Sequence, residues 1–151
     1  MEKTGKMYSQ VYCLHPVPES QKHYFGFKII RMSFKSISLG VITPANFKEA
    51  YSRDKPNAIC FDAYSHSIYN EGQKIELDVN VKLGDVIKAV VEVPKRMISW
   101  HLNQDQVGST EISENMAQQQ LYPYMEMSNK WIKIRLNHTD YDPSMNIGVT
   151  H

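Results

Sequence analysis

The sequence has no excess of charge of either sign and no long apolar run. Its 151 residues carry 17 Lys and Arg against 16 Asp and Glu, a formal net charge of +1. Surfaces that bind nucleic acid need clustered Lys and Arg, so this balance argues against a nucleic-acid partner. No segment approaches the ~18 apolar residues of a membrane-spanning helix, and the N-terminus lacks the apolar stretch of a signal peptide. We therefore expect no membrane association and an intracellular location, cytoplasmic or nuclear.

Cysteine is also scarce. The two cysteines, Cys13 and Cys60, both lie inside apolar runs. This placement favours buried free thiols in a reducing compartment. A single disulfide between Cys13 and Cys60 is the alternative.

The residue patterns of common catalytic and metal sites are missing. The six histidines show no H-E-x-x-H spacing, and the chain has no Cys-x-x-Cys pair. The seven glycines form neither a phosphate-binding loop nor a Gly-x-Ser-x-Gly turn. We therefore expect no enzymatic activity, no cofactor and no metal ion.

What the sequence does contain is a series of short segments in which β-branched and aromatic residues alternate with others. Ile98, Trp100 and Leu102 alternate in this way, as do Phe25 and Phe27. A period of two is typical of strands that bury one face. The predicted strands cover residues 7–14, 24–32, 37–42, 58–63, 68–73, 86–93, 97–102 and 131–136.

These strands predict an all-β protein, a sandwich of two antiparallel sheets with Trp100 buried between them. The length fits one domain. We expect that domain to cover residues 1–138, and residues 139–151 to form a C-terminal tail, because the tail lacks periodicity. A glycine within a predicted strand, Gly26, indicates a bulge or a close approach of two backbones.

Two long stretches interrupt the strand pattern. Residues 43–57 contain two prolines, several charges and two aromatic residues, and Thr43 is expected to cap a helical turn that begins at Pro44. Loops of this length in compact domains are usually functional or disordered. Residues 109–120 allow one or two helical turns with Ile112 and Met116 four apart, and their polar composition predicts that they lie outside the core.

The order of several short motifs resembles that of a SPRY domain. The resemblance spans roughly residues 20–137. It implies a bent, concanavalin-like jelly roll of two sheets, which binds partner proteins and is not catalytic. The matching motifs are His23-Tyr24-Phe25, Ser38-Leu39-Gly40-Val41, Ser67-Ile68-Tyr69-Asn70-Glu71-Gly72, Gly84-Asp85-Val86-Ile87, Ile98-Ser99-Trp100-His101-Leu102-Asn103, Val107-Gly108, Leu121-Tyr122-Pro123 and Ile132-Lys133-Ile134-Arg135-Leu136-Asn137.

The chain departs from the SPRY pattern at three places. Pro94-Lys95-Arg96 and Asn103-Gln104-Asp105 replace turns of the family, which leaves the turn types open. Some SPRY domains bind short peptides with a Val-Trp-Gly stretch before the last strand. This chain has Ser128-Asn129-Lys130 followed by Trp131 there, so that peptide pocket is not expected.

Six residues are candidates for contact with a partner. In SPRY domains the loops at one end of the sandwich form the recognition surface, and residues 43–57 and 64–67 map to that region by their order. Aromatic side chains in such loops make large interfaces with few rotatable bonds. The alternative is that these aromatic residues only hold their own loops, or that Trp131 covers a sheet. The candidates are Phe47, Tyr51, Arg53, Tyr64, His66 and Trp131.

The resemblance implies a non-catalytic module that binds a partner peptide or protein surface. Such modules often serve as substrate-recruiting adaptors beside ubiquitin-ligase components. The alternative is a structural subunit held permanently in a large multiprotein complex, in which neighbours would order residues 109–120 and the tail. An adaptor is expected to be monomeric, whereas a subunit is expected to expose a larger apolar patch.

Overall fold

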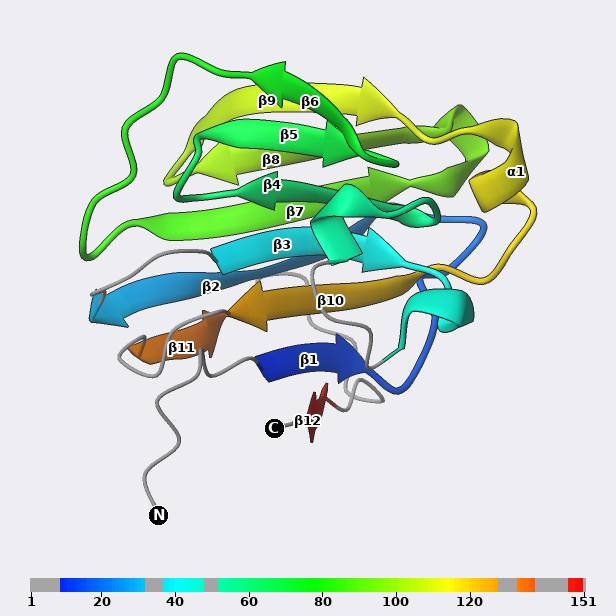
Figure 1. Cartoon of the computed structure of the whole chain (residues 1–151), viewed down its shortest axis with the longest axis horizontal. Coiled ribbons are helices and arrows are strands. Elements are labelled where there is room, and N and C mark those ends of the chain that lie inside the picture. The colour runs from blue at the N-terminus through cyan, green and yellow to red at the C-terminus, as the bar shows by residue number, and fades with distance from the viewer. Residues whose placement is uncertain (1–8, 32–36, 48–51, 128–132, 138–146, 151) are drawn as a thin grey trace.

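The computed structural model describes residues 9–31, 37–47, 52–127, 133–137 and 147–150 (Figure 1). They form two antiparallel sheets, which confirms the predicted all-β sandwich. The seven-stranded sheet runs through β12 (Ile147–Thr150), β1 (Ser9–Cys13), β10 (Tyr122–Met127), β3 (Ile37–Ile42), β4 (Ala58–Asp62), β5 (Ser67–Asn70) and β6 (Gln73–Glu76). The five-stranded sheet runs through β11 (Lys133–Asn137), β2 (His23–Arg31), β7 (Val86–Glu92), β8 (Met97–Leu102) and β9 (Asp105–Glu111).

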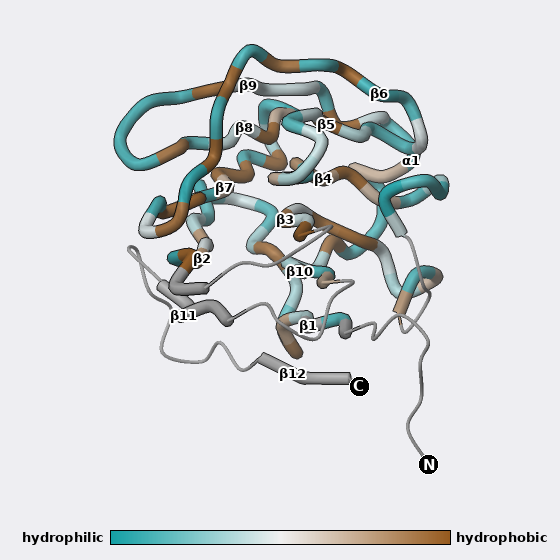
Figure 2. Tube along the Cα trace, turned by 60° about the vertical axis from the view of Figure 1, so that its left-hand side comes forward, coloured by the Kyte–Doolittle hydropathy of each residue, from teal (hydrophilic) through white to brown (hydrophobic). Residues whose placement is uncertain are grey.

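The predicted alternation places most of the buried apolar residues of both sheets in one core between them. Figure 2 shows hydrophobic colour on β3, β4 and β10 in the middle of the molecule. In β8, Ile98 and Trp100 are fully buried whereas Met97 is 37% exposed. The Trp100 indole Nε1 donates a hydrogen bond of 2.8 Å to the carbonyl oxygen of Leu39, which lies in the other sheet. Trp100 is therefore buried between the sheets as predicted, and its polar atom is satisfied there.

Gly26 lies at a close approach between β2 and β7, as its position in a strand predicted. A Cβ atom at this position would lie 2.2 Å from the carbonyl oxygen of Ile87. Real Cβ atoms do not come this close to backbone oxygen, so a larger residue would force the two strands apart.

The turn between β5 and β6 uses two residues with positive φ angles. These are Glu71 and Gly72, at 49° and 87°, the pattern of a type I′ hairpin. Asn70, the residue before them, stays in β5. Its side-chain Nδ2 donates to Thr110 Oγ1 and to the Glu111 carbonyl oxygen, both at 2.8 Å, and so ties β5 to β9.

The two unusual turns of the five-stranded sheet also use positive φ angles. Arg96 closes the 3-10 helix η3 (Val93–Lys95) with a φ of 52°. Asn103, in the two-residue connection between β8 and β9, has a φ of 57°. Asn tolerates this conformation better than most residues, so the chain reverses at Asn103 and Leu102 still pairs with Asp105.

The prediction that residues 109–120 lie outside the core was wrong. Strand β9 extends to Glu111, and a short helix, α1 (Glu114–Ala117), follows it. Ser113 caps α1, since its Oγ accepts a hydrogen bond of 3.2 Å from the Met116 amide. Ile112 and Met116 are fully buried. Two apolar residues four apart, with Ala117 packed beside the core, anchor a segment whose other residues are polar.

Residues 147–150, which were expected in the C-terminal tail, form β12 and pair with β1. The proposed limits of the domain stay a prediction. No helix among the described residues is long and apolar enough to cross a membrane.

Cys13 and Cys60 are both buried, and neither is in a disulfide. They lie on β1 and β4, which β10 and β3 separate in the sheet. Three strand spacings amount to about 14 Å, too far for a disulfide. Burial raises the pKa of each thiol to about 12.

Candidate interaction surface

A row of polar side chains crosses the outer face of the seven-stranded sheet. Its members are directly paired on five adjacent strands, and each is buried. Because the alternate residues of these strands face the core, the row points away from the core and needs another cover. The row consists of Gln10, Glu126, Ser38, Asp62 and Ser67.

That cover comes from residues 43–57. Its described parts include the 3-10 helices η1 (Pro44–Asn46) and η2 (Ser52–Asp54), and Figure 1 shows η2 in front of the sheet. The Ser52 amide donates to both carboxylate oxygens of Glu126, at 3.1 and 3.3 Å. Gln10 Nε2 donates to Ser52 Oγ at 3.3 Å and to the Asn46 carbonyl oxygen at 3.2 Å. The segment is therefore attached to the sheet by hydrogen bonds.

The expected cap of η1 does not form as predicted. Thr43 stands at the N-cap position and Pro44 begins the helix, but the Thr43 side chain makes no capping hydrogen bond. The Thr43 hydroxyl is buried instead.

Asp62, at the end of β4, joins η2 to the turn that follows β4. It is completely buried, and its Oδ2 accepts hydrogen bonds from Arg53 Nη1 at 2.5 Å and from Ser65 Oγ at 2.8 Å. Its Oδ1 accepts from the Tyr64 amide at 3.3 Å. The Arg53 guanidinium also lies over the ring of Tyr69, 5.2 Å from its centroid. One carboxylate thus fixes residues from two separate segments.

This environment keeps the Arg53 guanidinium protonated. Burial is the largest single influence and lowers the pKa of the guanidinium, but the negative charges around it, that of Asp62 first, together outweigh burial, and the pKa of Arg53 is raised. Arg53 keeps about a quarter of its side chain exposed, at 25%. It therefore presents a fixed positive charge at the surface.

The turn after β4 presents Tyr64 beside this charge. Tyr64 is 54% exposed. The turn is held at its other side, because Ser67 Oγ donates to the Ser65 carbonyl oxygen and the Leu77 amide donates to the His66 carbonyl oxygen, both at 2.9 Å. His66 adopts a φ of 53° within it. The turn is thus shaped before any partner arrives.

Phe47 lies apart from Arg53 and Tyr64. Its ring stacks on Tyr12 with 4.5 Å between the centroids, and it meets the edge of Tyr122 at 5.0 Å. This cluster packs beside Ile42, the last residue of β3. Ile42 is four residues further along β3 than Ser38 of the polar row. Four residues along a strand span about 13 Å. The packing fits the alternative interpretation, in which Phe47 holds its own loop.

The structure therefore brings together only part of the predicted site. Arg53, Tyr64 and His66 lie near Asp62, whereas Tyr51 and Trp131 fall outside the described residues. Residues 43–57 and the turn at 64–67 flank opposite ends of β4, rather than lying at one end of the sandwich as expected. They meet because η2 returns over the sheet and Arg53 reaches Asp62.

Sequence reasoning missed the residues that organise this surface. Asp62 and Glu126 were not assigned any role, although each is a charged residue inside an otherwise apolar strand. A buried charge is stable only with partners, so such a residue is a signal for a structural ion pair or hydrogen-bond network. Within the described residues, no group of three or more His, Cys, Asp or Glu side chains could hold a metal ion.

Comparison with known proteins identifies the fold. No protein-family model matches this chain, and no curated protein matches it by sequence. A solved structure of a human SPRY domain superposes with a TM-score of 0.63 at 20% identity, over 93% of this chain and 89% of that one. The SPRY domain of human HERC1 superposes with a TM-score of 0.66 at 21% identity, over 91% of this chain and 86% of that one. At this level of identity, the likeness establishes the fold.

Proposed function

We propose that this chain, which has the fold of SPRY domains, is a non-catalytic module that binds a partner peptide or protein surface. The contact surface would be the region around Asp62, with Arg53 and Tyr64 at its centre and His66 beside them. The observation that supports this is the buried Asp62 carboxylate, which holds the Arg53 guanidinium and the backbone amide of the largely exposed Tyr64. Tyr and Arg are enriched among the residues that dominate binding energy in protein interfaces.

Preorganisation strengthens the proposal. A side chain that is already fixed loses little conformational entropy on binding, so more of its contact energy appears as affinity. Tyr51 and Trp131, which lie outside the described residues, stay candidates for partner contact. We assign Phe47 a structural role in its own loop, because its ring already packs against Tyr12 and Tyr122.

A recruiting adaptor fits the exposed surface better than a permanently bound subunit. The exposed large apolar side chains in the described part of the chain belong to separate segments and different strands. A permanent subunit would be expected to gather them into one patch. These side chains are Leu14, Tyr64, Ile75, Leu83 and Met97.

The test is affinity capture of partners by the intact chain, followed by a titration of the captured partner against Tyr64→Ser. We expect binding to weaken about thirtyfold or more, as for an interface residue that contributes ~2 kcal/mol. The thermal midpoint should move by no more than a few degrees, because an exposed change alters stability by about 0.5 kcal/mol.

Leu14→Ser is the matched control. Leu14 is 57% exposed and follows β1, four residues along the chain from Gln10 of the polar row. It should bind the partner as the wild type does. Equal binding by Tyr64→Ser and wild type would remove the proposed surface.

A further inference from the structure

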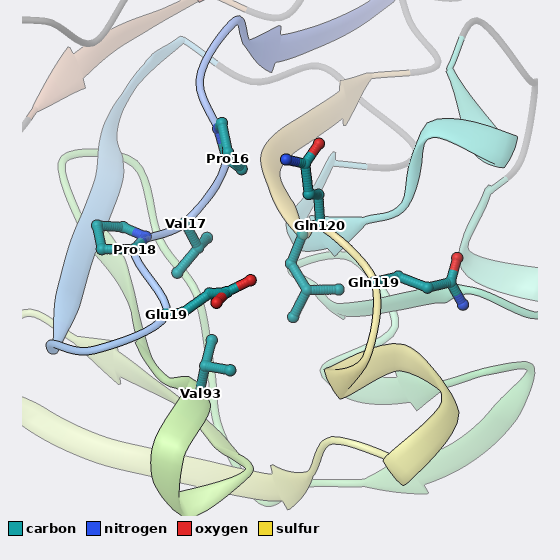
Figure 3. Close-up of a pocket in the computed structure, with 8 residues that line it drawn as sticks. Pro16, Val17, Pro18, Glu19, Val93, Gln119 and Gln120 are labelled. Carbon is teal, nitrogen blue, oxygen red and sulfur yellow. The ribbon is translucent and has the colours of Figure 1, made fainter.

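A pocket of about 330 Å³ lies at the other end of the sandwich (Figure 3). It is lined by residues 16–19, between β1 and β2, by Val93 of η3, and by residues 119–121, between α1 and β10. Leu121 directly precedes β10. The first residue of β10, Tyr122, pairs with Ile42 at the end of β3, and Ile42 pairs in turn with Ala58 at the start of β4. Tyr64 follows the end of β4, so the pocket and the Asp62 region are at opposite ends.

The walls of this pocket are preformed. The Val17 amide donates a hydrogen bond of 2.6 Å to the Leu121 carbonyl oxygen, and both side chains are almost completely buried. Gln119 Nε2 donates to Asn57 Oδ1 at 3.1 Å. Pro16 and Pro18 flank Val17, and their rings fix the backbone on that side. The pocket therefore does not need to be shaped by a ligand.

The chemistry of the pocket is apolar with one negative charge. Figure 3 shows the Glu19 carboxylate pointing into the space between Val17, Val93 and Gln120. Glu19 is exposed, and it is the one charged residue of the eight that line the pocket.

Two lysines in the segments that adjoin the pocket walls are already engaged by another carboxylate. Lys22 and Lys95 both pair with Glu92, at 3.5 and 3.3 Å. Glu92 directly precedes Val93 of the pocket wall. The carboxylate of Glu19 is therefore left to face a positive charge from outside the chain.

We propose that this pocket binds one basic side chain, Lys or Arg, from an extended peptide segment of a partner protein. The aliphatic part of such a side chain matches Val93, Leu121 and the prolines, and its cationic head matches Glu19, with the amide group of Gln120 at the rim. A volume at the lower end of the range for ligand pockets suits one side chain and its neighbours rather than a large cofactor. This second site lies outside the Asp62 region and adds to the proposed function.

The test uses three capped tripeptides, Val-Arg-Val, Val-Gln-Val and Val-Glu-Val, in NMR titrations of the intact chain. With Val-Arg-Val, the amide signals of Val17, Glu19, Val93 and Gln120 should shift and approach saturation at about 10 mM. Val-Gln-Val should bind about two- to fivefold more weakly, as expected for the loss of a partly exposed ion pair. Val-Glu-Val should cause no shifts at these positions.

Glu19→Gln tests the role of the carboxylate, because the exchange keeps the shape of the pocket. The variant should bind the Arg and Gln tripeptides equally, and the preference of the wild type for Arg should fall as salt is raised. Glu76→Gln, on the exposed strand β6 at the far edge of the seven-stranded sheet from β1, should behave as wild type.

Equal shifts from all three tripeptides, or no shifts at about 10 mM, would overturn the proposal. So would an unchanged preference for Arg in Glu19→Gln. None of these results bears on Tyr64, whose role is decided separately by partner capture. Loss of partner binding in Tyr64→Ser with an intact tripeptide response would separate the two sites.

Discussion

The two faces of the seven-stranded sheet are both buried, but different interactions bury them. On the inner face, Leu39, Phe61 and Ile68 pack against the five-stranded sheet in one apolar core. On the outer face, a polar row that includes Asp62 and Glu126 is covered by the described residues of 43–57 through hydrogen bonds and an ion pair. Apolar contacts tolerate small shifts, whereas a buried charge depends on each of its partners. The outer face should therefore be the less stable of the two and the more sensitive to single polar substitutions.

The inner face should show the largest effect. Trp100→Ala removes a fully buried indole and its hydrogen bond to Leu39, so we expect a loss of about 3–5 kcal/mol in the free energy of unfolding. Denaturant titration measures this loss. Met97→Ala, on the exposed side of the same strand, is the control and should change little. A small loss for Trp100→Ala would mean that the core does not depend on the contact between the sheets.

The outer face should respond next. Asp62→Ala removes the acceptor of Arg53, Tyr64 and Ser65, and we expect a loss of about 2–3 kcal/mol in the free energy of unfolding. This is less than for a wholly buried pair, because Arg53 is partly exposed. The measurement is again denaturant titration.

Asp54→Ala is the matched control for Asp62. Asp54 also faces Arg53, at 3.7 Å, but it is exposed. Its removal should cost no more than about 0.5 kcal/mol. Equal losses for the two variants would contradict the view that one buried carboxylate holds the cover in place.

The aromatic cluster should contribute a smaller amount. Phe47→Ser removes the stack with Tyr12 and the edge contact with Tyr122, and we expect a loss of about 1–2 kcal/mol. Thermal and denaturant unfolding both measure it. A loss below about 0.5 kcal/mol, as for an exposed residue, would return Phe47 to the candidates for direct partner contact.

The two thiols report on the two faces separately, with no effect on stability expected at neutral pH. Cys60 lies in the outer-face cluster with Tyr69 and Tyr124, whereas Cys13 alternates with Tyr12 and so faces inward. Burial raises the pKa of each from 9.0 to about 12, so the folded state favours the protonated thiol. This stabilisation is complete below pH 9 and is lost as the pH rises from about 9 towards 12.

Thiol labelling at pH 8 measures the same comparison. Both cysteines should label quickly after unfolding without a reductant, and slowly in the folded chain. In Asp62→Ala, labelling of Cys60 should accelerate while labelling of Cys13 stays slow. Equal acceleration at both sites would mean that the cover and the core open together.

The same difference explains how much the sequence could predict. The inner face follows from alternation within single strands, so β2, β3 and β8 were predicted almost to the residue. The cover depends on contacts between distant residues: Ser52 and Glu126 are 74 positions apart. No local pattern encodes that contact. The polar composition of residues 109–120 likewise concealed Ile112 and Met116, which the fold buries completely.

The candidate site was predicted in part for the same reason. Arg53 and Tyr64 were identified as polar and aromatic residues in irregular segments, which local sequence does reveal. The residue that joins them, Asp62, sits in a strand and was passed over. Its charge within the run Ala58–Asp62 was the available signal, since a carboxylate in a buried strand requires a cationic or hydrogen-bonding partner elsewhere.

The Asn70 side chain has a consequence for the behaviour of the protein in concentrated solution. Strand β9 is an edge strand of its sheet, and between Asp105 and Glu111 it carries no charged residue. An edge strand without charged residues is a template on which a second molecule can add a strand and begin aggregation. Because Asn70 already donates to the Glu111 carbonyl oxygen and to Thr110, an incoming strand would have to displace it. The Asn70 amide thus blocks strand addition at the Glu111 end of this edge.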